Sequence, residues 1–471
     1  MTKRRTKAKA KPPSRSKARE PQPGLSRAEI VYLVLSGLSV AVSIVKAPLF
    51  PISDPALFAF FGRAMLHGQR LYVDLHDNKL PSIYLVNLVW QALLDDHYVL
   101  HNVVEGLINA GSIALFALLL RRVNVASWAL GTFLFAFFFT IPYPQFGFTQ
   151  HYGIFFVVLA LYLNARGAAL AGGIALAIAV SFWIPGVLIA PAALVQMRER
   201  RQRIAFLAGF LGPIALCSAA ALAVIGPRFA HVIAGWPGYA RAIFRLNVPQ
   251  LGAIFTHSAV LPALGTMALL LAVVVRRPIP PAARFACVWL ACAFVAGFIP
   301  PSFAEYYFLP TIPPLAMSIA AFEPRLRDVV RHPLTSLAAL ALFGIMLRQT
   351  VYNTTAVRVN SAYVQHLGEW IRASYGSGAE VFTASYFPEI QLAADSHNIG
   401  RLWSRSEPAP NVIVADPRGL PQLLRLPRPF KWKFGGADFV YVPVCPNLTG
   451  PIVIYALRSN ADAFNCRTLS L

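Results

Sequence analysis

The sequence has few charged residues for its length, and few of these are acidic. Of 471 residues only 13% are charged, and 20 Asp and Glu stand against 42 Lys and Arg. Apolar residues make up 56% of the chain, and the mean hydropathy is +0.55. This balance favours a polytopic membrane protein over a soluble globular one.

The excess of basic residues has a second meaning in such a chain. A net charge of +22 would suggest nucleic-acid binding in a soluble protein. Here Lys and Arg lie in short clusters between apolar runs, which is the pattern of membrane topology signals, so we expect no nucleic-acid partner. The first cluster, residues 1–28, predicts a disordered basic cytoplasmic tail that orients the first span or contacts anionic lipid headgroups.

Long apolar runs predict an all-α polytopic membrane bundle. A span needs about 20 apolar residues, and the chain offers about eleven such segments. Alternate connections are basic, so the positive-inside rule places the N-terminus inside the cell. The expected spans are 30–49, 103–120, 126–142, 152–163, 168–182, 184–195, 204–225, 251–275, 285–299, 308–322 and 334–347.

The organisation of the chain follows from these spans. We expect a transmembrane domain over 29–350, whose first outer loop, 48–102, carries surface helices at 55–66 and 82–94. Short β-rich runs alternate with helical runs such as 362–373 in residues 351–471, and they predict a small α/β domain outside the cytoplasm. This domain carries no Gly-rich phosphate loop or nucleophile motif, and we expect it to cover the outer site and help select the acceptor.

Five cysteines fall into two groups. Cys217, Cys287 and Cys292 lie in apolar spans without nearby metal ligands, so we expect packing residues. Cys445 and Cys466 belong to the predicted outer domain, where an oxidising compartment would make them candidates for a disulfide.

The polar residues of the first outer loop are the candidate site. Residues 53–81 gather Asp54, Asp74, Asp77, Arg70 and Lys79 between strongly apolar segments. An ionised carboxylate such as Asp54 can act as a general base on a hydroxyl. A compact positive charge such as Lys79 suits a phosphate.

These residues also carry a resemblance. Asp54, the run Gly68-Gln-Arg-Leu-Tyr-Val-Asp74 and the run Asp77-Asn-Lys79-Leu-Pro81 resemble the first outer loop of polytopic glycosyltransferases with a GT-C fold. The similarity is to the bacterial branch with protein mannosyltransferase-like, lipid A aminoarabinose transferase-like and lipopolysaccharide-core galacturonosyltransferase-like enzymes. A later run, Glu305-Tyr306-Tyr307-Phe308-Leu-Pro310, resembles an aromatic motif of the same branch.

The resemblance implies a GT-C-like bundle and a reaction for this chain. A hexosyl or pentosyl group would move from a polyprenyl-phosphate carrier to a glycan, lipid or protein acceptor on the outer face of a bacterial inner membrane. Asp54 matches the carboxylate that orients or deprotonates the acceptor, and Lys79 matches the lysine that neutralises the carrier phosphate. Substrate-binding candidates are Arg70, Tyr72, Asp74, Asp77, Tyr84, Gln150, His151, Glu305, Tyr306 and Tyr307.

The sequence departs from the family pattern at the second acidic position. Gln150 and His151 stand where the family commonly has an acid that opens the fourth span, and Glu305 stands for a late His. We expect His151 or Glu305 to replace the missing acid. A divalent cation bridging Asp54, His151 and Glu305 would be one use of these groups, although no known metal spacing is present, so no metal ligand is assigned.

Other interpretations of the same residues stay open. Asp74 and Asp77 beside Arg70 and Lys79 could be a solvated ion-pair cluster. Lys79 could instead snorkel to the headgroups, and Tyr306 or Tyr307 could belong to the interfacial aromatic belt. A multi-span transporter or lipid flippase is the alternative function, although no internal repeat is visible.

Overall fold

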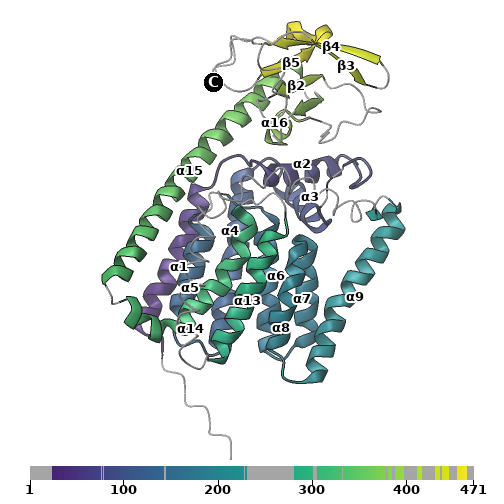
Figure 1. Cartoon of the computed structure of the whole chain (residues 1–471). Coiled ribbons are helices and arrows are strands. Elements are labelled where there is room, and N and C mark those ends of the chain that lie inside the picture. Colours follow the sequence, from purple (N-terminus) through teal and green to yellow (C-terminus); the bar gives the residue numbers. More distant parts are fainter. Residues whose placement is uncertain are drawn as a thin grey trace, which may run out of the picture.

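A bundle of long helices carries a small sheet beyond one end, with shorter helices between the two (Figure 1). The structure is a computed structural model, and it describes residues 24–75, 77, 79–142, 145–227, 229–230, 280–300, 305–330, 333–376, 380–383, 388–396, 411–415, 430–434, 437–444 and 453–463. Among the predicted features, the span 251–275 and both cysteines of the candidate disulfide, Cys445 and Cys466, lie outside these residues.

The bundle follows the predicted apolar runs. Its elements are α1 (Arg27–Lys46), α4 (Tyr98–Arg122), α5 (Trp128–Thr140), α6 (Thr149–Ala165), α7 (Ala169–Phe182), η1 (Ile184–Ile189), α8 (Ala190–Val195), α9 (Arg200–Ile225), α13 (Pro281–Phe298), η3 (Glu305–Thr311) and α14 (Ile312–Val330). By length and composition, α1, α4, α9 and α13 are long and apolar enough to cross a membrane. The all-α membrane bundle with a small α/β unit is confirmed as the fold class.

The start of α1 shows why the bundle begins where the basic tail ends. Ser26 Oγ accepts a hydrogen bond from the Glu29 backbone N–H, and the Glu29 carboxylate accepts one from the Ser26 N–H. This capping box satisfies two backbone donors that the first turn of a helix leaves unpaired. The apolar run of α1 can therefore start directly after polar residues.

A layer of two short helices covers one end of the bundle. The predicted segments 55–66 and 82–94 form α2 (Asp54–Leu66) and α3 (Ser82–Leu94). On α3, Leu85, Val89 and Leu93 form an exposed apolar stripe at the spacing of one helix face. Residues 54–62 of α2 are all buried by other parts of the protein. That both helices lie on the membrane surface stays a prediction.

The C-terminal unit supplies part of the cover over α2. A helix, α15 (Pro333–Tyr375), leads from the bundle to a short helix, α16 (Pro388–Ala393), and α16 lies between the sheet and α2 (Figure 1). At 1.5 Å per residue, α15 is about 65 Å long, roughly twice a hydrocarbon core. The predicted helix 362–373 is thus the end of α15 and not a separate element.

The sheet has five strands in the order β1-β2-β5-β4-β3. These are β1 (Val381–Thr383), β2 (Val412–Ala415), β3 (Phe430–Phe434), β4 (Ala437–Val444) and β5 (Val453–Leu457). Strands β1 and β2 are parallel and the other pairs are antiparallel. Leu367 and Ile371 of α15 and Ile390 of α16 share a core with the buried strand residues, so the sheet and both helices form one packed unit.

Candidate functional site

The loop between α2 and α3 folds back on itself and brings Lys79 to the start of α2. The Tyr72 N–H donates to Leu75 O at 2.7 Å, and the Tyr72 hydroxyl donates to the Lys79 carbonyl at 2.5 Å. Burial and the nearby Asp77 carboxylate raise the pKa of Tyr72 above its usual value, so its hydroxyl stays protonated and can donate. Tyr72 therefore holds this loop in its folded-back conformation. The motif resemblance predicts that Tyr72 binds substrate, and that role stays a prediction.

Lys79 lies between two carboxylates. Its Nζ is 3.3 Å from Asp54 Oδ2 and 3.7 Å from Asp77 Oδ2. The same Nζ lies 5.0 Å from the centre of the Phe58 ring, one turn along α2 from Asp54. Two of the predicted site residues, Asp54 and Lys79, are thus in direct contact.

Two tyrosines complete this group. Tyr84 of α3 donates its hydroxyl to Asp77 Oδ2 at 2.6 Å, and Tyr306 of η3 donates to Asp54 Oδ2 at 3.1 Å. We call Asp54, Asp77, Lys79, Tyr84 and Tyr306 the Lys79 cluster. Its members come from α2, the loop, α3 and η3, so folding of the whole bundle is required to assemble it.

Burial is unequal within the Lys79 cluster. The side chain of Asp77 is 1% exposed and that of Asp54 8%, whereas that of Lys79 is 21% exposed. Buried carboxylates hold an ammonium that still faces solvent. An anion that approaches from solvent would contact Lys79 before the two carboxylates. The anion would then compete with Asp54 for the positive charge of Lys79.

Tyr306 is itself held by an aromatic stack. Its ring lies 4.2 Å from that of Phe148, with 19° between the two planes, and 4.6 Å from the ring of Tyr307. Phe148 directly precedes α6, so this stack ties η3 to the bundle. Tyr306 therefore has a structural anchor and a hydroxyl that reaches the site, which an interfacial belt residue would not need.

Arg70 and Asp74 lie apart from the cluster. Arg70 Nε is 3.2 Å from Asp74 Oδ2, and the side chains are 72% and 41% exposed. Asp74 also accepts a hydrogen bond from the Arg70 N–H at 2.8 Å. The two residues form a solvated turn, which agrees with the alternative interpretation of these charges.

Gln150 and His151 begin α6 but do not reach the Lys79 cluster by any described contact. Gln150 is buried and accepts a hydrogen bond from the Thr149 hydroxyl at 3.1 Å. His151 lies among the rings of Phe139, Phe146 and Phe148, and its Nδ1 has no hydrogen-bond partner among the described residues. The side chain of Glu305 lies outside the described residues.

These positions do not fit the suggested cation site. The ammonium of Lys79 already lies between Asp54 and Asp77, and a divalent cation there would have to displace it. His151 is surrounded by phenyl rings instead of oxygen ligands. In the part of the chain that the structure describes, no group of three or more His, Cys, Asp or Glu side chains is arranged to hold a metal ion.

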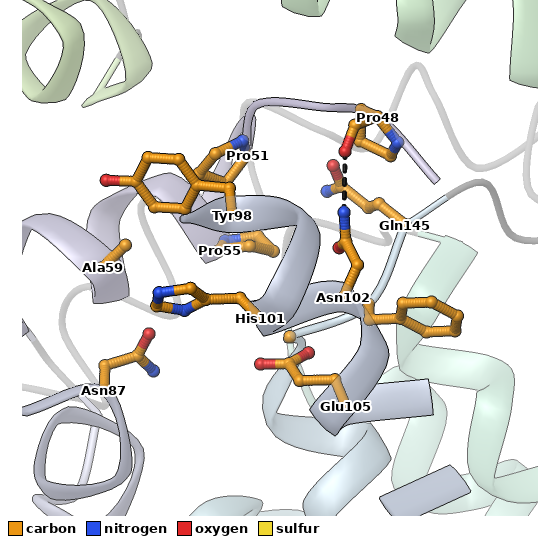
Figure 2. A pocket seen from close by; sticks show the side chains of 12 residues that line it. Pro48, Pro51, Pro55, Ala59, Asn87, Tyr98, His101, Asn102, Glu105 and Gln145 are labelled. Carbon is orange, nitrogen blue, oxygen red and sulfur yellow. Dashed lines mark hydrogen bonds between the residues drawn. The ribbon is translucent and has the colours of Figure 1, made fainter. Parts of the chain in front are cut away.

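A small cavity of about 30 Å³ lies on another face of α2. Figure 2 shows its lining, in which Asn102 donates a hydrogen bond to Pro48 O at 2.8 Å. Pro55 and Ala59 face this cavity, whereas Asp54 and Phe58 face Lys79. Consecutive residues of a helix are rotated by about 100° about its axis, so the two pairs lie on different faces of α2. The cavity has room for a couple of water molecules and not for a sugar.

Glu105 is the charged residue of this cavity lining. Its Oε1 accepts a hydrogen bond from the Tyr152 hydroxyl at 2.7 Å, and Trp90 donates in turn to the Tyr152 oxygen. Gly147 comes so close that a Cβ atom there would lie 3.1 Å from Glu105 Oε2. Glu105 thus belongs to a hydrogen-bonded group with Tyr152 and Trp90 beside the cavity, and it is not a member of the Lys79 cluster.

Three contributors to the site carried no signal in the sequence. Phe148, Ser53 and Glu389 act through contacts with residues far away in the chain. Ser53 precedes Asp54, and its N–H donates to the Glu389 carboxylate 336 positions later. Asp54 and Lys79 could be found because each lies beside a recognisable motif.

No protein-family model matches the chain, and no curated protein matches it in sequence. Among solved structures, ArnT from Cupriavidus metallidurans bound to undecaprenyl phosphate matches with a TM-score of 0.49 and 13% identity, over 93% of this chain and 98% of that chain. Apo ArnT gives a TM-score of 0.47 and 14% identity, over 93% and 100%.

An oligosaccharyltransferase from Archaeoglobus fulgidus, in complex with Zn and sulfate, also matches. Its TM-score is 0.48 and its identity 12%, over 93% of this chain and 76% of that chain. ArnT, an aminoarabinose transferase, and the oligosaccharyltransferase are both GT-C fold glycosyltransferases.

Proposed function

We propose that this protein is an integral membrane glycosyltransferase that moves a sugar from a polyprenyl-phosphate carrier to an acceptor hydroxyl. The observation that carries the proposal is the Lys79 cluster, in which a partly exposed ammonium is held against a buried carboxylate. The motif resemblance of the loop and of η3 supports the same reaction. The bundle supplies the apolar setting that a lipid carrier requires.

Lys79 is the group that would receive the carrier phosphate. It is the more exposed partner of its ion pair with Asp54, and its ammonium can turn to an arriving anion. When the bond between the anomeric carbon and the phosphate oxygen breaks, negative charge grows on the leaving phosphate. A fixed ammonium at this place stabilises that charge more in the transition state than in the ground state.

Asp54 is the group that would act on the acceptor. Once the phosphate takes over part of the Lys79 charge, the Asp54 carboxylate can accept the proton of an acceptor hydroxyl. The acceptor oxygen then forms the new bond to the anomeric carbon, and the carrier leaves as polyprenyl phosphate. The hydrogen bond from Tyr306 holds Asp54 in place during this exchange.

Asp77 and Tyr84 support Lys79 from the buried side. Asp77 is almost fully enclosed, and its Oδ2 accepts from Tyr84 while lying 3.7 Å from Lys79 Nζ. A second carboxylate keeps the lysine charged in an enclosed place. It also leaves a net negative charge beside the developing positive charge of an oxocarbenium-like transition state.

The proposal includes a location and an acceptor class. We place the Lys79 cluster and the C-terminal unit on the outer face of a bacterial inner membrane, with the N-terminus in the cytoplasm, because the basic connections alternate along the chain. The acceptor would be a glycan, a lipid or a protein of the cell envelope, and the transferred group a hexose or pentose.

The direct test is a transfer assay in proteoliposomes with a panel of polyprenyl-phosphate sugars and envelope acceptors. Asp54→Asn should lower kcat/KM by roughly 10² to 10⁴, because the base is lost while the hydrogen bond from Tyr306 is kept. Asp74→Asn is the matched control in the same loop, and it should leave transfer within about twofold.

Two results would overturn this function. Equal transfer by wild type and Asp54→Asn would remove the role of Asp54. Absence of transfer with every donor, together with passage of a substrate across the vesicle membrane, would identify a transporter instead.

A further inference from the structure

The segment that leads into Asp54 is held by the C-terminal part of the chain. Residues 47–53, here called the entry segment, connect α1 to α2. The Ser361 hydroxyl of α15 donates to Phe50 O at 2.7 Å, and Ile52 packs against the core shared by the sheet, α15 and α16. The entry segment is thus part of the interface between the bundle and the C-terminal unit.

Ser53, the last residue of the entry segment, has an unusual backbone conformation. Its φ is 60° and its ψ is −137°, a region that residues with a Cβ atom rarely adopt. A strained residue persists only where its surroundings impose the conformation. Because Ser53 directly precedes Asp54, a change in its backbone angles would redirect the first turn of α2 and the Asp54 carboxylate with it.

Glu389 contacts the backbone of Ser53 directly. Its Oε2 accepts a hydrogen bond from the Ser53 N–H at 3.1 Å, and the residue is 6% exposed. Ser53 is the N-cap of α2 but makes no capping hydrogen bond with its own side chain. A carboxylate from α16 therefore supplies, from another part of the chain, the fixed contact at this helix start.

Glu389 is itself fixed against α2 by neighbours on α16. Arg63 of α2 donates to the carbonyl of Leu392, and its Nη1 lies 3.5 Å from Asp395 Oδ1. Leu392 and Ala393 belong to the hydrophobic core that α2 and α3 share. Since these contacts hold the C-terminal end of α16 against α2, they restrict how far Glu389 can follow Ser53 if that residue relaxes.

We propose that Glu389 is a positioning residue for Asp54. It holds Ser53 in its strained conformation and so keeps the Asp54 carboxylate between Lys79 and Tyr306. The placement of the C-terminal unit then determines whether the site is assembled. This inference rests on the proposed function for its catalytic consequence, but the geometry that it asserts can be measured without any turnover.

The first test uses the full-length protein in proteoliposomes. Glu389→Ala should lower kcat by roughly 10- to 100-fold with little change in KM for the donor, because Lys79 is untouched while Asp54 is misplaced. Glu389→Gln is the conservative variant. It keeps an acceptor oxygen for the Ser53 N–H and should retain transfer within about threefold.

Ser53 provides a test that does not alter the C-terminal unit. Ser53→Gly should transfer like wild type, and Ser53→Val should lose activity as Glu389→Ala does, because glycine accepts a positive φ whereas a β-branched residue resists it. The loss of kcat in Glu389→Ala should be partly reversed when Ser53→Gly is added, by roughly half on a logarithmic scale. Glycine adopts a positive φ without strain, so the Glu389 contact is no longer needed to keep residue 53 in that conformation. A purely structural role of Glu389 would predict no such rescue and would overturn the proposal.

Amide hydrogen exchange separates this proposal from the proposed function. Exchange at residues 48–58 should be faster in Glu389→Ala than in wild type and should return to the wild-type rate in Glu389→Gln. Unchanged exchange in Glu389→Ala would overturn the positioning role whatever the activity. If wild type transfers no sugar, the proposed function fails, while the exchange result still decides the role of Glu389.

Discussion

Two ion pairs of the same loop have opposite surroundings. Arg70 and Asp74 lie 3.2 Å apart with most of the arginine side chain in solvent. Lys79 and Asp54 lie 3.3 Å apart, with the carboxylate 8% exposed and the ammonium 5.0 Å from the centre of the Phe58 ring. The distances are nearly equal, so distance alone does not distinguish a solvated pair from a candidate reaction centre.

The difference lies in the hydration and the hydrogen bonds of each pair. An exposed pair is screened by water and contributes little, whereas a buried pair needs further hydrogen bonds to offset the loss of hydration. Tyr84 and Tyr306 provide such bonds to Asp77 and Asp54. A buried charge cluster with several dedicated neighbours is expected where function requires it, whereas water can solvate Arg70 and Asp74 directly.

After Asp54→Asn, the largest expected loss of transfer follows from removing the charge of Lys79. Lys79→Met keeps an unbranched side chain but removes the charge that lies over Phe58, so transfer should fall by roughly 10² to 10³. Arg70→Met removes a charge of the same sign from the exposed pair and should leave transfer within about twofold. Both variants are measured by kcat/KM with the same donor, and equal losses in the two would break the comparison.

The second prediction concerns Glu389, a buried carboxylate that accepts a hydrogen bond from the Ser53 N–H, whereas Asp54 is paired with an ammonium. Burial raises the pKa of Glu389 to about 7 from its ordinary 4.5, although the hydrogen bond from Ser53 lowers it in part. The folded protein therefore binds a proton between these two values that the unfolded chain lacks. The contribution of Glu389 to stability is complete below pH 4.5 and is lost as the pH rises through 7.

The change between pH 4.5 and 8 should be on the order of 3 kcal/mol. We expect the Tm of wild type in detergent to fall relative to that of Glu389→Gln between pH 5 and pH 8, since glutamine does not titrate. A constant difference between the two over that range would show that burial does not raise the pKa of Glu389.

The third prediction tests the close contact between α2 and α3, the helices that carry Asp54 and Tyr84 of the Lys79 cluster. Gly62 of α2 lies against the backbone of α3, and a Cβ atom there would be 2.6 Å from Asn87 O. Gly62→Ala must push the two helices apart, which should cost about 1 to 3 kcal/mol of stability. Transfer should fall too, because α2 carries Asp54 and α3 carries Tyr84.

Gly68, beside the exposed pair, is the matched control. Its φ is 88°, and a Cβ atom there would meet none of the described residues within 4 Å beyond its chain neighbours. Gly68→Asn should change stability by less than about 0.5 kcal/mol, since asparagine tolerates a positive φ. Thermal unfolding in detergent measures both variants. A tolerated Gly62→Ala would mean that α2 and α3 do not need their close contact.

The sequence predicts the local parts of this site well. The helices 55–66 and 82–94 appear with ends that agree within a residue, because their apolar runs are bounded by proline, glycine and charged residues. Asp54 and Lys79 are singled out by the motifs beside them, although the sequence does not predict that the two side chains are in contact. Such features depend on neighbours a few residues away, which are visible in the order of the chain.

The parts that the sequence misses depend on distant neighbours. Nothing near Glu389 indicates that it would meet Ser53, and the stack of Phe148 on Tyr306 joins segments far apart in the chain. Strand β3, with its alternating lysines, lacks the apolar run that marks the other strands. The family pattern predicts His151 in the site, but its ring is packed among phenylalanines.

The smallest expected effect is the coupling between Arg70 and Asp74. A double-mutant cycle with Arg70→Gln and Asp74→Asn should give about 0.2 to 1 kcal/mol in low salt and close to zero in about 1 M salt, because water reaches both side chains and screens the pair. Asparagine keeps the acceptor for the Arg70 N–H, so the cycle measures the charge contact and not the turn. A coupling well above about 1 kcal/mol that persists in high salt would mean that Arg70 and Asp74 are enclosed when the enzyme is active, for instance under a bound acceptor. Arg70 and Asp74 could then no longer be separated, as a solvated pair, from the reacting pair Lys79 and Asp54.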